Sequence, residues 1–535
     1  MLRRMVRLAP LAPLAFAFCQ LSAQAPRAAS LPAGPKPTLV VFLTIDQMRS
    51  DYFQRFGAQL TGGLRRLYDG GAFFTDGYQD HGVTETAPGH ASTMSGRFPV
   101  HTGIATNSEG VNTWDAPLIG APEEGASPFR FHGTTLTDWL RAADHNTRFL
   151  SVSRKDRGAI LPIGTSRGPV FWLSPSTGLM TTSRYYADTL PSWVQRFNAR
   201  KIPQSYAGKA WTPLLAPDAY PEPDSVPIEA MGRDYAFPHV LSDDPQAAVA
   251  GFANYPWMDE MTLSLALDGV RQLGLGDSDR TDLLAVSLST TDAVGHKWGP
   301  DSKELHDQIL RLDRTLGVFL DSLFKLRDQR RIVIALTGDH GMTPFPQLKS
   351  TLYPNGEAKL VSLDAQWAAF LARLKAAGVD STAVSFEGGL VTVRDESAFQ
   401  KAHVNADSLA LTFAHDAMMV QGVMRAQLIT QIAKQDTVTD AISRRWLHTL
   451  DPAGATRLVI TLTPYSYWEN VRYATHGSPH DSDAHVPILF WGEGVRPGRY
   501  GGYVRVVDMA PTLAALLGIR PQQALDGHVL TQALR

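Results

Sequence analysis

The sequence predicts an α/β protein in which helices flank both faces of a central, mostly parallel sheet that carries cap insertions. Three apolar runs rich in β-branched residues, within 38–46, 282–296 and 330–341, are typical of buried parallel strands. Between the second and third runs, residues 302–328 carry apolar side chains at helical spacing. Strand, helix and strand in this order predict a βαβ unit, and therefore a sheet covered on both faces. In such sheets the functional crevice lies at the carboxyl ends of the strands.

The first 25 residues (1–25) predict a cleaved signal peptide. Three arginines precede an apolar stretch, 8–18, and a small-x-small sequence ends at Ala25. The apolar stretch is shorter than the about 20 residues of a membrane-spanning helix, so we expect no stable membrane span. The only cysteine, Cys19, lies inside this leader, and a Pro- and Ala-rich linker, 26–37, follows it. We therefore expect a periplasmic or secreted protein without disulfides.

Composition and charge exclude several classes of protein. With 535 residues, 44% hydrophobic and 19% charged, the chain resembles an ordinary globular protein with a large core. The formal net charge of −2 provides no basic footprint, so we expect no binding of nucleic acid. We expect a monomer whose partners are small molecules.

One catalytic domain, 38–520, is predicted to contain two insertions. The first, about 161–280, is rich in Pro, Trp and Tyr and is interpreted as a cap. The second, about 350–470, has mixed helical and strand patterns. The chain then returns to the sheet through a strand at 485–492, and 521–535 forms a C-terminal tail.

The stretch VTETAPGH, residues 83–90, has two interpretations. A threonine could cap a helix that begins near His90, because Thr is a good N-cap. Alternatively, a threonine hydroxyl lies at the end of a strand and attacks a substrate. Thr84 and Thr86 share a face of an extended segment, so the spacing alone leaves both as candidates. Gly89 would permit a tight turn beside them.

Acidic residues and histidines gather at the ends of the predicted strands. Asp292 and His296 are four residues apart, so one short turn can direct both at the same ion. Asp339 and His340 are adjacent, and at a strand end they point in opposite directions. Carboxylate and imidazole ligands suit zinc, and two such ions need roughly seven ligands. The candidate ligands are Asp46, Asp292, His296, Asp339, His340, His476, His480 and His485.

Seven motifs, spread over about 38–520, together point to one family. They are TIDQMRSDY, TETAPGHASTMSGRFPVHTGI, SRKDRGAILP, STTDAVGHKWGP, LTGDHGM, THGSPHDSDAHVPILFWG and VVDMAPTLAALLGI. The chain resembles the alkaline phosphatase superfamily in these motifs and in their order. It is most similar to the nucleotide pyrophosphatase/phosphodiesterase branch, and in particular to the bacterial phosphate-irrepressible alkaline phosphatases with a threonine nucleophile. The resemblance implies an alkaline phosphatase-like fold.

The resemblance also implies two zinc ions, held by side chains at the strand ends. For the first zinc, the implied ligands are Asp292, His296 and His476, with His485 as the runner-up for the last position. For the second zinc, the implied ligands are Asp46, Thr86, Asp339 and His340. Thr86, which immediately precedes Ala-Pro-Gly-His, is the implied nucleophile.

The implied chemistry is hydrolysis of small phosphate monoesters through a phosphothreonine intermediate that releases inorganic phosphate. Zinc would favour the alkoxide of Thr86, which attacks phosphorus. Asn107, Lys155 and Arg157 match the family's monoesterases and would bind the extra oxygens of a monoester dianion. Lys155 and Arg157 are two residues apart, so an extended segment would direct both the same way. The sequence therefore predicts a phosphoric monoester hydrolase of the alkaline phosphatase type.

Two other functions are weighed against this prediction. The first is a nucleotide pyrophosphatase/phosphodiesterase, which would use the same metals and nucleophile on diesters. The second is a non-catalytic metal-binding protein that has kept the fold. It is disfavoured because every proposed ligand position carries a competent side chain.

Overall fold

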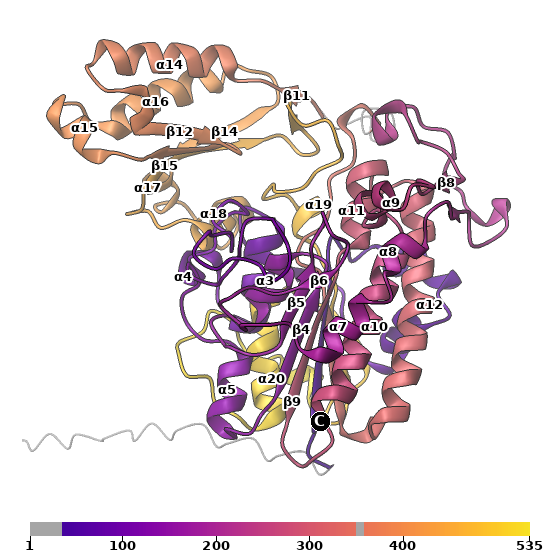
Figure 1. Ribbon diagram of the computed structural model, residues 1–535. Coiled ribbons are helices and arrows are strands. Elements are labelled where there is room, and N and C mark those ends of the chain that lie inside the picture. Colours follow the sequence, from indigo (N-terminus) through magenta and orange to yellow (C-terminus); the bar gives the residue numbers. More distant parts are fainter. Residues whose placement is uncertain (1–34, 349–357) are drawn as a thin grey trace, which may run out of the picture.

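A nine-stranded sheet forms the centre of the fold in the part of the chain that the structure describes, residues 35–348 and 358–535. The structure is a computed structural model (Figure 1). The strand order is β18-β2-β17-β10-β1-β9-β4-β5-β6. The strands are β1 (Leu39–Ile45), β2 (Ala72–Phe74), β4 (Phe149–Ser153), β5 (Val170–Leu173), β6 (Met180–Thr181), β9 (Asp282–Leu288), β10 (Ile332–Thr337), β17 (Ile488–Gly492) and β18 (Gly498–Tyr500).

The sheet is mostly parallel, which confirms the predicted α/β class. Strands β10, β1, β9, β4 and β5 run parallel to one another, whereas β17 and β6 run antiparallel to their neighbours. Strand β1 lies between β9 and β10, so the βαβ crossover through α11 (Thr290–Trp298) and α12 (Lys303–Leu326) passes over it. The three acid-terminated strands are therefore immediate neighbours.

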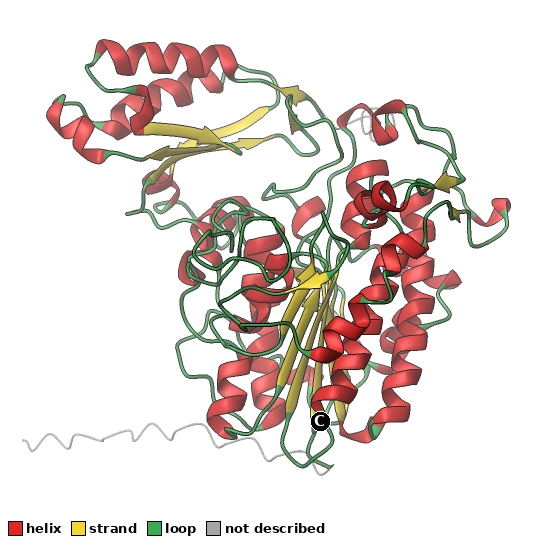
Figure 2. Ribbon diagram, in the orientation of Figure 1, coloured by secondary structure: helices red, strands yellow, loops and turns green. Residues whose placement is uncertain are grey.

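Side-chain alternation along β1 divides the core into two layers, which Figure 2 shows as helices on both sides of the yellow strands. Val41 and Leu43 pack with helices α2 (Gly63–Gly70), α10 (Trp257–Leu273) and α12. Val40 and Phe42 pack with helices α3 (Thr86–Ser95), α5 (Leu136–Ala143) and α20 (Met509–Leu517). The strand residues are buried on both faces, which explains why the strand sequences are continuously apolar.

The region expected to be a cap, 161–280, is divided between the core and a projecting part. Strands β5 and β6 belong to the central sheet, and α10 covers one of its faces. Helix α7 (Ser192–Asn198) packs beside α10 through Trp193, Val194 and Phe197. The projecting part contains α8 (Ile202–Ser205), β7 (Ala210–Trp211), β8 (His239–Val240) and α9 (Pro245–Phe252). Buried polar contacts attach it to α12, including a hydrogen bond of 2.6 Å from Trp211 Nε1 to Asp307.

The second insertion is a separate α/β module, which we call the insertion module and define as residues 358–470. Its four-stranded sheet has the order β12-β13-β15-β14 and is antiparallel throughout. Its elements are β11 (Leu360–Val361), α14 (Asp364–Ala376), β12 (Val384–Glu387), β13 (Leu390–Val393), α15 (Glu396–Lys401), α16 (Ala406–Ala417), β14 (Val423–Leu428), α17 (Ile429–Ile432), α18 (Ala441–Thr449), β15 (Thr456–Leu462) and β16 (Tyr467–Trp468). The module has its own apolar core and stands above the central sheet in Figure 1.

Several short elements and the chain ends complete the fold. The short elements are α1 (Tyr52–Arg55), β3 (Gly77–Tyr78), α4 (Pro99–Thr102), α6 (Asp156–Ile160), α19 (Asp481–Ala484) and β19 (Val504–Arg505). The residues expected to form a tail, 521–535, pack on the core through the buried Leu530 and Ala533. The predicted signal peptide, 1–25, and most of the predicted linker lie outside the described residues. Among the residues that are described, none of the helices is long and apolar enough to cross a membrane.

Candidate active site

The candidate active site lies where three parallel strands end. Asp46 directly follows β1, and Asp339 and His340 lie just beyond β10. Asp292 lies in α11, which begins just after β9. Because β10, β1 and β9 are parallel neighbours, their carboxyl ends meet at one edge of the sheet. All four side chains are buried, with at most 3% of each residue exposed.

Asp292 and His296 lie one helical turn apart on α11. The short turn expected to carry them is part of a helix, because the segment TTDAVGHKW forms α11 directly after Ser289. Side chains four residues apart share one face of a helix. His296 Nε2 accordingly lies 3.2 Å from Asp292 Oδ1. The spacing therefore directs both side chains at one point, as expected, but through a helix.

Two groups of side chains are arranged so that each could hold a metal ion. Within each group, one possible ligand atom per residue lies within 4.8 Å of the others. The groups are Asp292, His296 and His476, and Asp46, Asp292 and His340. Asp292 belongs to both groups, so the two positions adjoin. Asp339 lies beside the second group, with Oδ2 3.6 Å from His340 Nε2.

The C-terminal histidine in this cluster is His476. Its Nε2 lies 3.7 Å from Asp292 Oδ1. His485, the runner-up, instead contacts the backbone oxygen of Thr75 through Nε2 at 2.8 Å. His480 likewise uses Nε2 on a backbone oxygen, 2.8 Å away, in the insertion module. The structure thus brings one of the three candidate histidines to the two carboxylate groups.

The three histidines of the cluster make the same kind of hydrogen bond to the backbone. In each ring Nδ1 lies within hydrogen-bonding distance of a backbone carbonyl, at 2.6 Å for His296, 2.8 Å for His340 and 2.8 Å for His476. A carbonyl only accepts, so each Nδ1 carries the proton and donates it. In the neutral form of each ring, Nε2 is then the lone-pair nitrogen, and it faces the carboxylates. This is the arrangement in which a histidine is held ready to bind a metal.

The carboxylates of Asp46 and Asp339 provide the test of whether this set fits metal ions. Both side chains are fully buried, and their contacts in the described residues are with cationic or imidazole nitrogens: Lys155 Nζ lies 2.6 Å from Asp46 Oδ2, and His90 Nδ1 lies 3.0 Å from Asp339 Oδ2. Buried carboxylate oxygens are costly unless a hydrogen bond or a cation compensates them. Together with three imidazole nitrogens they form the mixed oxygen and nitrogen donor set that zinc accepts. The residues therefore fit divalent cations.

Lys155 extends into the same cluster. Its Nζ lies 2.6 Å from Asp46 Oδ2 and 2.7 Å from Asp292 Oδ2. It also donates to the hydroxyl of Thr86 at 3.1 Å. One ammonium group therefore links both metal-ligand groups to the proposed nucleophile.

The pKa shifts in the cluster indicate that its carboxylates are stabilised by nearby positive charge. Burial disfavours the ionised form of Asp292, but the charges of Lys155 and His296 hold its pKa well below its usual range. Burial also disfavours protonated His340, but Asp339 and Asp46 raise its pKa to about 9. The pKa of His476, by contrast, is lowered by burial and by the neighbouring His340. Burial and the neighbouring histidines thus favour the neutral imidazole form of His476.

Thr86 is the first residue of α3, and its hydroxyl faces the cluster. The preceding Glu85 is extended, and the helix follows directly. Thr86 Oγ1 lies 3.5 Å from His340 Nε2 as well as 3.1 Å from Lys155 Nζ. The N-terminus of a helix favours negative charge, which suits a group that binds phosphate or becomes an alkoxide.

The structure distinguishes Thr84 from Thr86. Thr84 Oγ1 donates to the backbone oxygen of Ser478 at 2.8 Å, so it fastens the loop that carries His476. The helix begins at Thr86 and not near His90, which corrects one interpretation of VTETAPGH. The tight turn expected at Gly89 is also wrong, because Gly89 lies within α3. A Cβ there would lie 2.2 Å from the backbone oxygen of Asp339, so glycine is required by close packing.

Asn107 and Arg157, the other predicted phosphate-binding residues, lie around Glu85. The side-chain Oδ1 of Asn107 accepts a hydrogen bond from the backbone N–H of Ala87 at 2.8 Å. The backbone N–H of Asn107 donates to Glu85 Oε2 at 2.6 Å. Burial raises the pKa of Glu85, and the charge of Arg157 opposes that rise. Lys155 precedes α6 and Arg157 lies within it, so the extended segment expected for this pair is wrong for Arg157.

Gln47 is the residue that the sequence prediction missed. Its backbone N–H donates to Asp339 Oδ1 at 3.0 Å, and its Nε2 donates to the backbone oxygen of Asp292 at 3.2 Å. Gln47 has a positive φ of 66°, which turns the chain sharply after Asp46. The only signal in the sequence is its position directly after a strand-end aspartate. Gln47 thus connects Asp339 to Asp292 through hydrogen bonds.

Comparison with known proteins identifies the family of this chain. A family model, type I phosphodiesterase / nucleotide pyrophosphatase, matches residues 40–384, which is well over half of the chain. The chain belongs to this family. The alkaline phosphatase PhoV of Synechococcus elongatus is 30% identical over 94% of this chain and 93% of that protein. The alkaline phosphatase PhoK of a Sphingomonas species is 30% identical over 94% of this chain and 92% of that protein.

Solved structures of relatives share the fold. The crystal structure of the alkaline phosphatase PafA has a TM-score of 0.87 at 26% identity, covering 94% of this chain and 100% of that one. A murine ectonucleotide pyrophosphatase/phosphodiesterase has a TM-score of 0.52 at 13% identity, which shows the fold alone. The resemblance inferred from the seven motifs is therefore confirmed, and so is the alkaline phosphatase-like fold.

Proposed function

We propose that this family member is a phosphomonoesterase of the alkaline phosphatase type that uses Thr86 as its nucleophile. The observation that carries the proposal is the convergence on one hydroxyl: Lys155 Nζ lies 3.1 Å and His340 Nε2 lies 3.5 Å from Thr86 Oγ1. The names of the full-length bacterial relatives support the monoesterase activity. The leader at 1–25 supports a periplasmic or secreted location.

Two zinc ions are part of the proposal. The residues that would hold the first are Asp292, His296 and His476. Those that would hold the second are Asp46, Thr86, Asp339 and His340. Bound there, zinc supplies Lewis acidity that favours ionised oxygen and stabilises charge on the phosphoryl oxygens.

The protein's own side chains perform the remaining work. Thr86 Oγ attacks phosphorus, so the Oγ–P bond forms while the bond to the alcohol oxygen breaks and the alcohol takes up a proton. Lys155 donates a hydrogen bond to Oγ1, which lowers the energy of its ionised form. Water then hydrolyses the phosphothreonine and releases inorganic phosphate. The strand ends and the first turn of α3 hold the reacting groups in a fixed arrangement, which lowers the entropic cost of bringing them together.

Monoesters are favoured over diesters by the cations and donors that surround Thr86. A monoester dianion has one more charged oxygen than a diester, and it needs additional donors. Asn107, Lys155 and Arg157 can supply them, and Lys155 is already 2.7 Å from Asp292. The experiment compares kcat/KM for 4-nitrophenyl phosphate and bis(4-nitrophenyl) phosphate. We expect faster turnover of the monoester; faster turnover of the diester would instead support a nucleotide pyrophosphatase/phosphodiesterase, as the family model's description suggests.

A non-catalytic metal-binding protein is the remaining candidate. It requires that the purified, zinc-loaded protein hydrolyse neither ester above the rate of a Thr86→Ala variant. The buried hydroxyl of Thr86 beside several buried carboxylates argues against it, because such costly groups are typical of functional sites.

A further inference from the structure

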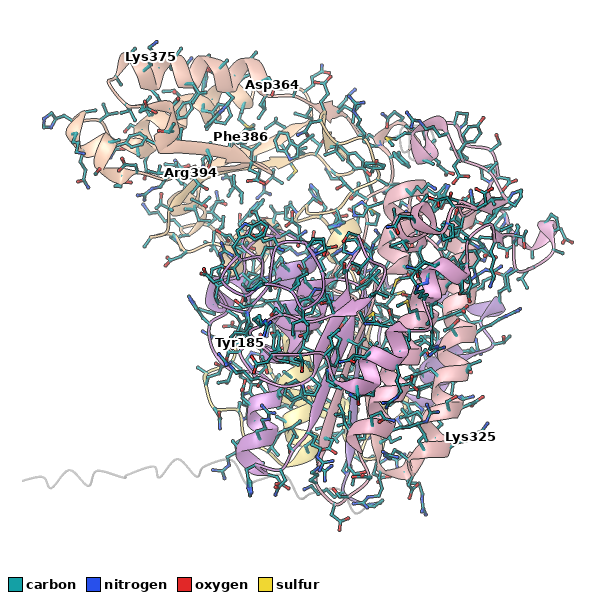
Figure 3. All side chains as sticks on the ribbon, in the orientation of Figure 1. Tyr185, Lys325, Asp364, Lys375, Phe386 and Arg394 are labelled. Atoms are coloured by element: carbon teal, nitrogen blue, oxygen red, sulfur yellow. The ribbon has the colours of Figure 1, made fainter. Side chains whose placement is uncertain are left out.

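A large cavity lies between the candidate active site and the insertion module. Its volume is about 1080 Å³, and on one side it is bordered by Glu85, Asn107 and His476. On the other side it is bordered by strand and loop residues of the module, including Phe386. Figure 3 labels Phe386 on the module, which stands above the body that carries the active site. The free volume next to the proposed phosphate site is thus partly walled by the module.

A tight hairpin carries Glu387 to this cavity. Strands β12 and β13 pair with Glu387 opposite Leu390, which leaves Gly388 and Gly389 as a two-residue turn. Their φ angles of 58° and 87° are those that such a turn requires. A Cβ on Gly389 would lie 2.6 Å from the backbone oxygen of Ile460. The tip is therefore seated closely on β15, and this packing fixes where Glu387 lies.

Aromatic side chains of the module line the same cavity. Trp367 and Phe386 have ring centroids 5.4 Å apart, and Phe386 and Trp468 have centroids 5.6 Å apart. All three are only half-buried, so part of each ring remains uncovered. Uncovered aromatic rings in a cavity can stack on a flat apolar group, and their faces attract cations.

Acidic side chains predominate among the charged residues around the cavity. They are Glu85, Glu109, Asp364, Glu387, Glu469 and Asp483. Among the described lining residues, Arg394 is the one arginine and no lysine occurs. The cavity therefore has a negative potential. Such a cavity repels a negatively charged group and attracts a positively charged one.

We propose that this cavity receives the alcohol part of the substrate, and that it selects aromatic alcohols with a positive charge over those with a negative charge. The inference rests on the proposed phosphomonoesterase function. A phosphate bound between Asn107 and Lys155 must extend its alcohol into adjoining free volume, and the cavity borders Asn107. Trp468 and Phe386 contact the ring of the alcohol, and Glu387 attracts its charge. The insertion module is thus a specificity element.

The test uses three aryl monoesters that differ in charge and little in leaving-group pKa. They are 4-(aminomethyl)phenyl, 4-methylphenyl and 4-(carboxymethyl)phenyl phosphate, in which a methylene insulates the charge from the ring. We expect kcat/KM to fall in that order, with about a tenfold difference between the cationic and anionic esters. Glu387→Gln is expected to reduce this ratio about fivefold at low salt, and less at high salt, because the interaction is partly exposed and screened.

Trp468→Ala tests the aromatic wall. It is expected to lower kcat/KM for all three aryl esters relative to methyl phosphate, whose alcohol is too small to reach the ring. Two matched controls lie outside the cavity lining: Glu396→Gln on the exposed first turn of α15, and Trp114→Ala at a side chain that is 71% exposed. Both controls are expected to keep the wild-type ratios.

The outcomes separate this inference from the proposed function. Hydrolysis of all three aryl esters at equal rates, with no change in Glu387→Gln, would overturn the inference and leave the phosphomonoesterase standing. Failure to hydrolyse any monoester would overturn both. If Trp468→Ala does not fold, the charge ratio in Glu387→Gln still decides, because Glu387 is an exposed side chain at a hairpin tip. Inhibition by inorganic phosphate, which has no alcohol part, reports on the phosphate site separately.

Discussion

The ammonium nitrogen of Lys155 lies 2.6 Å from Asp46 Oδ2, at the end of the central strand of the sheet. The same nitrogen is 3.1 Å from Thr86 Oγ1. A cation at this position does two things at once: it compensates buried carboxylates, and it faces the oxygen that we propose attacks phosphorus. The proposed catalytic residues are therefore coupled electrostatically, and substitutions at any one of them should alter the others.

Removal of the Thr86 hydroxyl should abolish turnover. Thr86→Ala is expected to lower kcat with 4-nitrophenyl phosphate by at least about 10³-fold, because the proposed mechanism has no other side chain that attacks phosphorus. Thr86→Ser should retain measurable activity. Thr84→Ala is the matched control, since its hydroxyl bonds to Ser478 O and takes no part in the attack. Acid quenching followed by intact mass measurement should detect the phosphorylated wild-type protein; an equal phosphorylated fraction in Thr86→Ala would contradict the assignment.

Loss of the Lys155 ammonium should affect monoesters more than diesters. Lys155→Ala is expected to reduce kcat/KM for 4-nitrophenyl phosphate by about 10²-fold or more, and that for the bis ester much less, because the dianion loses a charged donor. The measurement is the ratio of the two values. Lys325→Ala, at an exposed position near the end of α12, is the control. Equal losses on both esters would show that Lys155 has no selective role in binding the dianion.

Metal content should distinguish His476 from His485. His476→Ala is expected to lose about one zinc per chain, because Nε2 of this ring faces Asp292. His485→Ala should keep both ions, since its Nε2 contacts Thr75 O. Elemental analysis after dialysis against a weak chelator measures both. A full zinc complement in His476→Ala would remove this histidine from the proposed set.

The buried carboxylate of Asp80 should make stability depend on pH. Arg445 is fully buried, with its side chain 2% exposed, and its Nε lies 3.4 Å from Asp80 Oδ1. Burial opposes ionisation of Asp80, but hydrogen bonds from His448 and Arg444 hold its pKa below the usual range. A lowered folded-state pKa contributes stability above the unfolded value of about 4, and that stability is lost as the pH falls below it.

Asp80→Asn tests this expectation. The variant should lose about 3 kcal/mol of unfolding free energy at pH 7, because a buried guanidinium loses a partner. The difference from the wild type should shrink towards pH 3. Urea unfolding at the two pH values measures it, with Asp436→Asn, whose carboxylate bonds within its own exposed turn, as the control. A difference that does not change with pH would contradict the assignment.

Several features of the site could be predicted because they depend on local sequence. Asp46 and Asp339 were found from apolar strand runs that end in an acid, and Asp292 with His296 from their spacing. Other features depend on packing. The sequence places the start of this helix near His90 and not at Thr86, because Pro88, Gly89 and several hydroxyl residues interrupt its apolar periodicity.

The choice between His476 and His485 shows the same division. Both lie in an irregular segment without periodicity, so the sequence provided only the resemblance of the THG motif. In the structure Nδ1 of His476 bonds to the backbone oxygen of Thr84, 392 residues away in sequence. A hydrogen bond over that separation depends on how α3 and the C-terminal loop pack, and local patterns do not encode it.

The sequence by itself determined the α/β class, the family and the residue types that converge at the strand ends. These depend on hydrophobic periodicity and on short motifs, which are local properties of the chain. The tertiary structure alone decided which histidine joins the cluster, that Gln47 links its two halves, and that the module forms a wall of the cavity bordered by Glu85 and His476. These depend on contacts between distant segments, which become defined only when the two apolar faces of the sheet are covered.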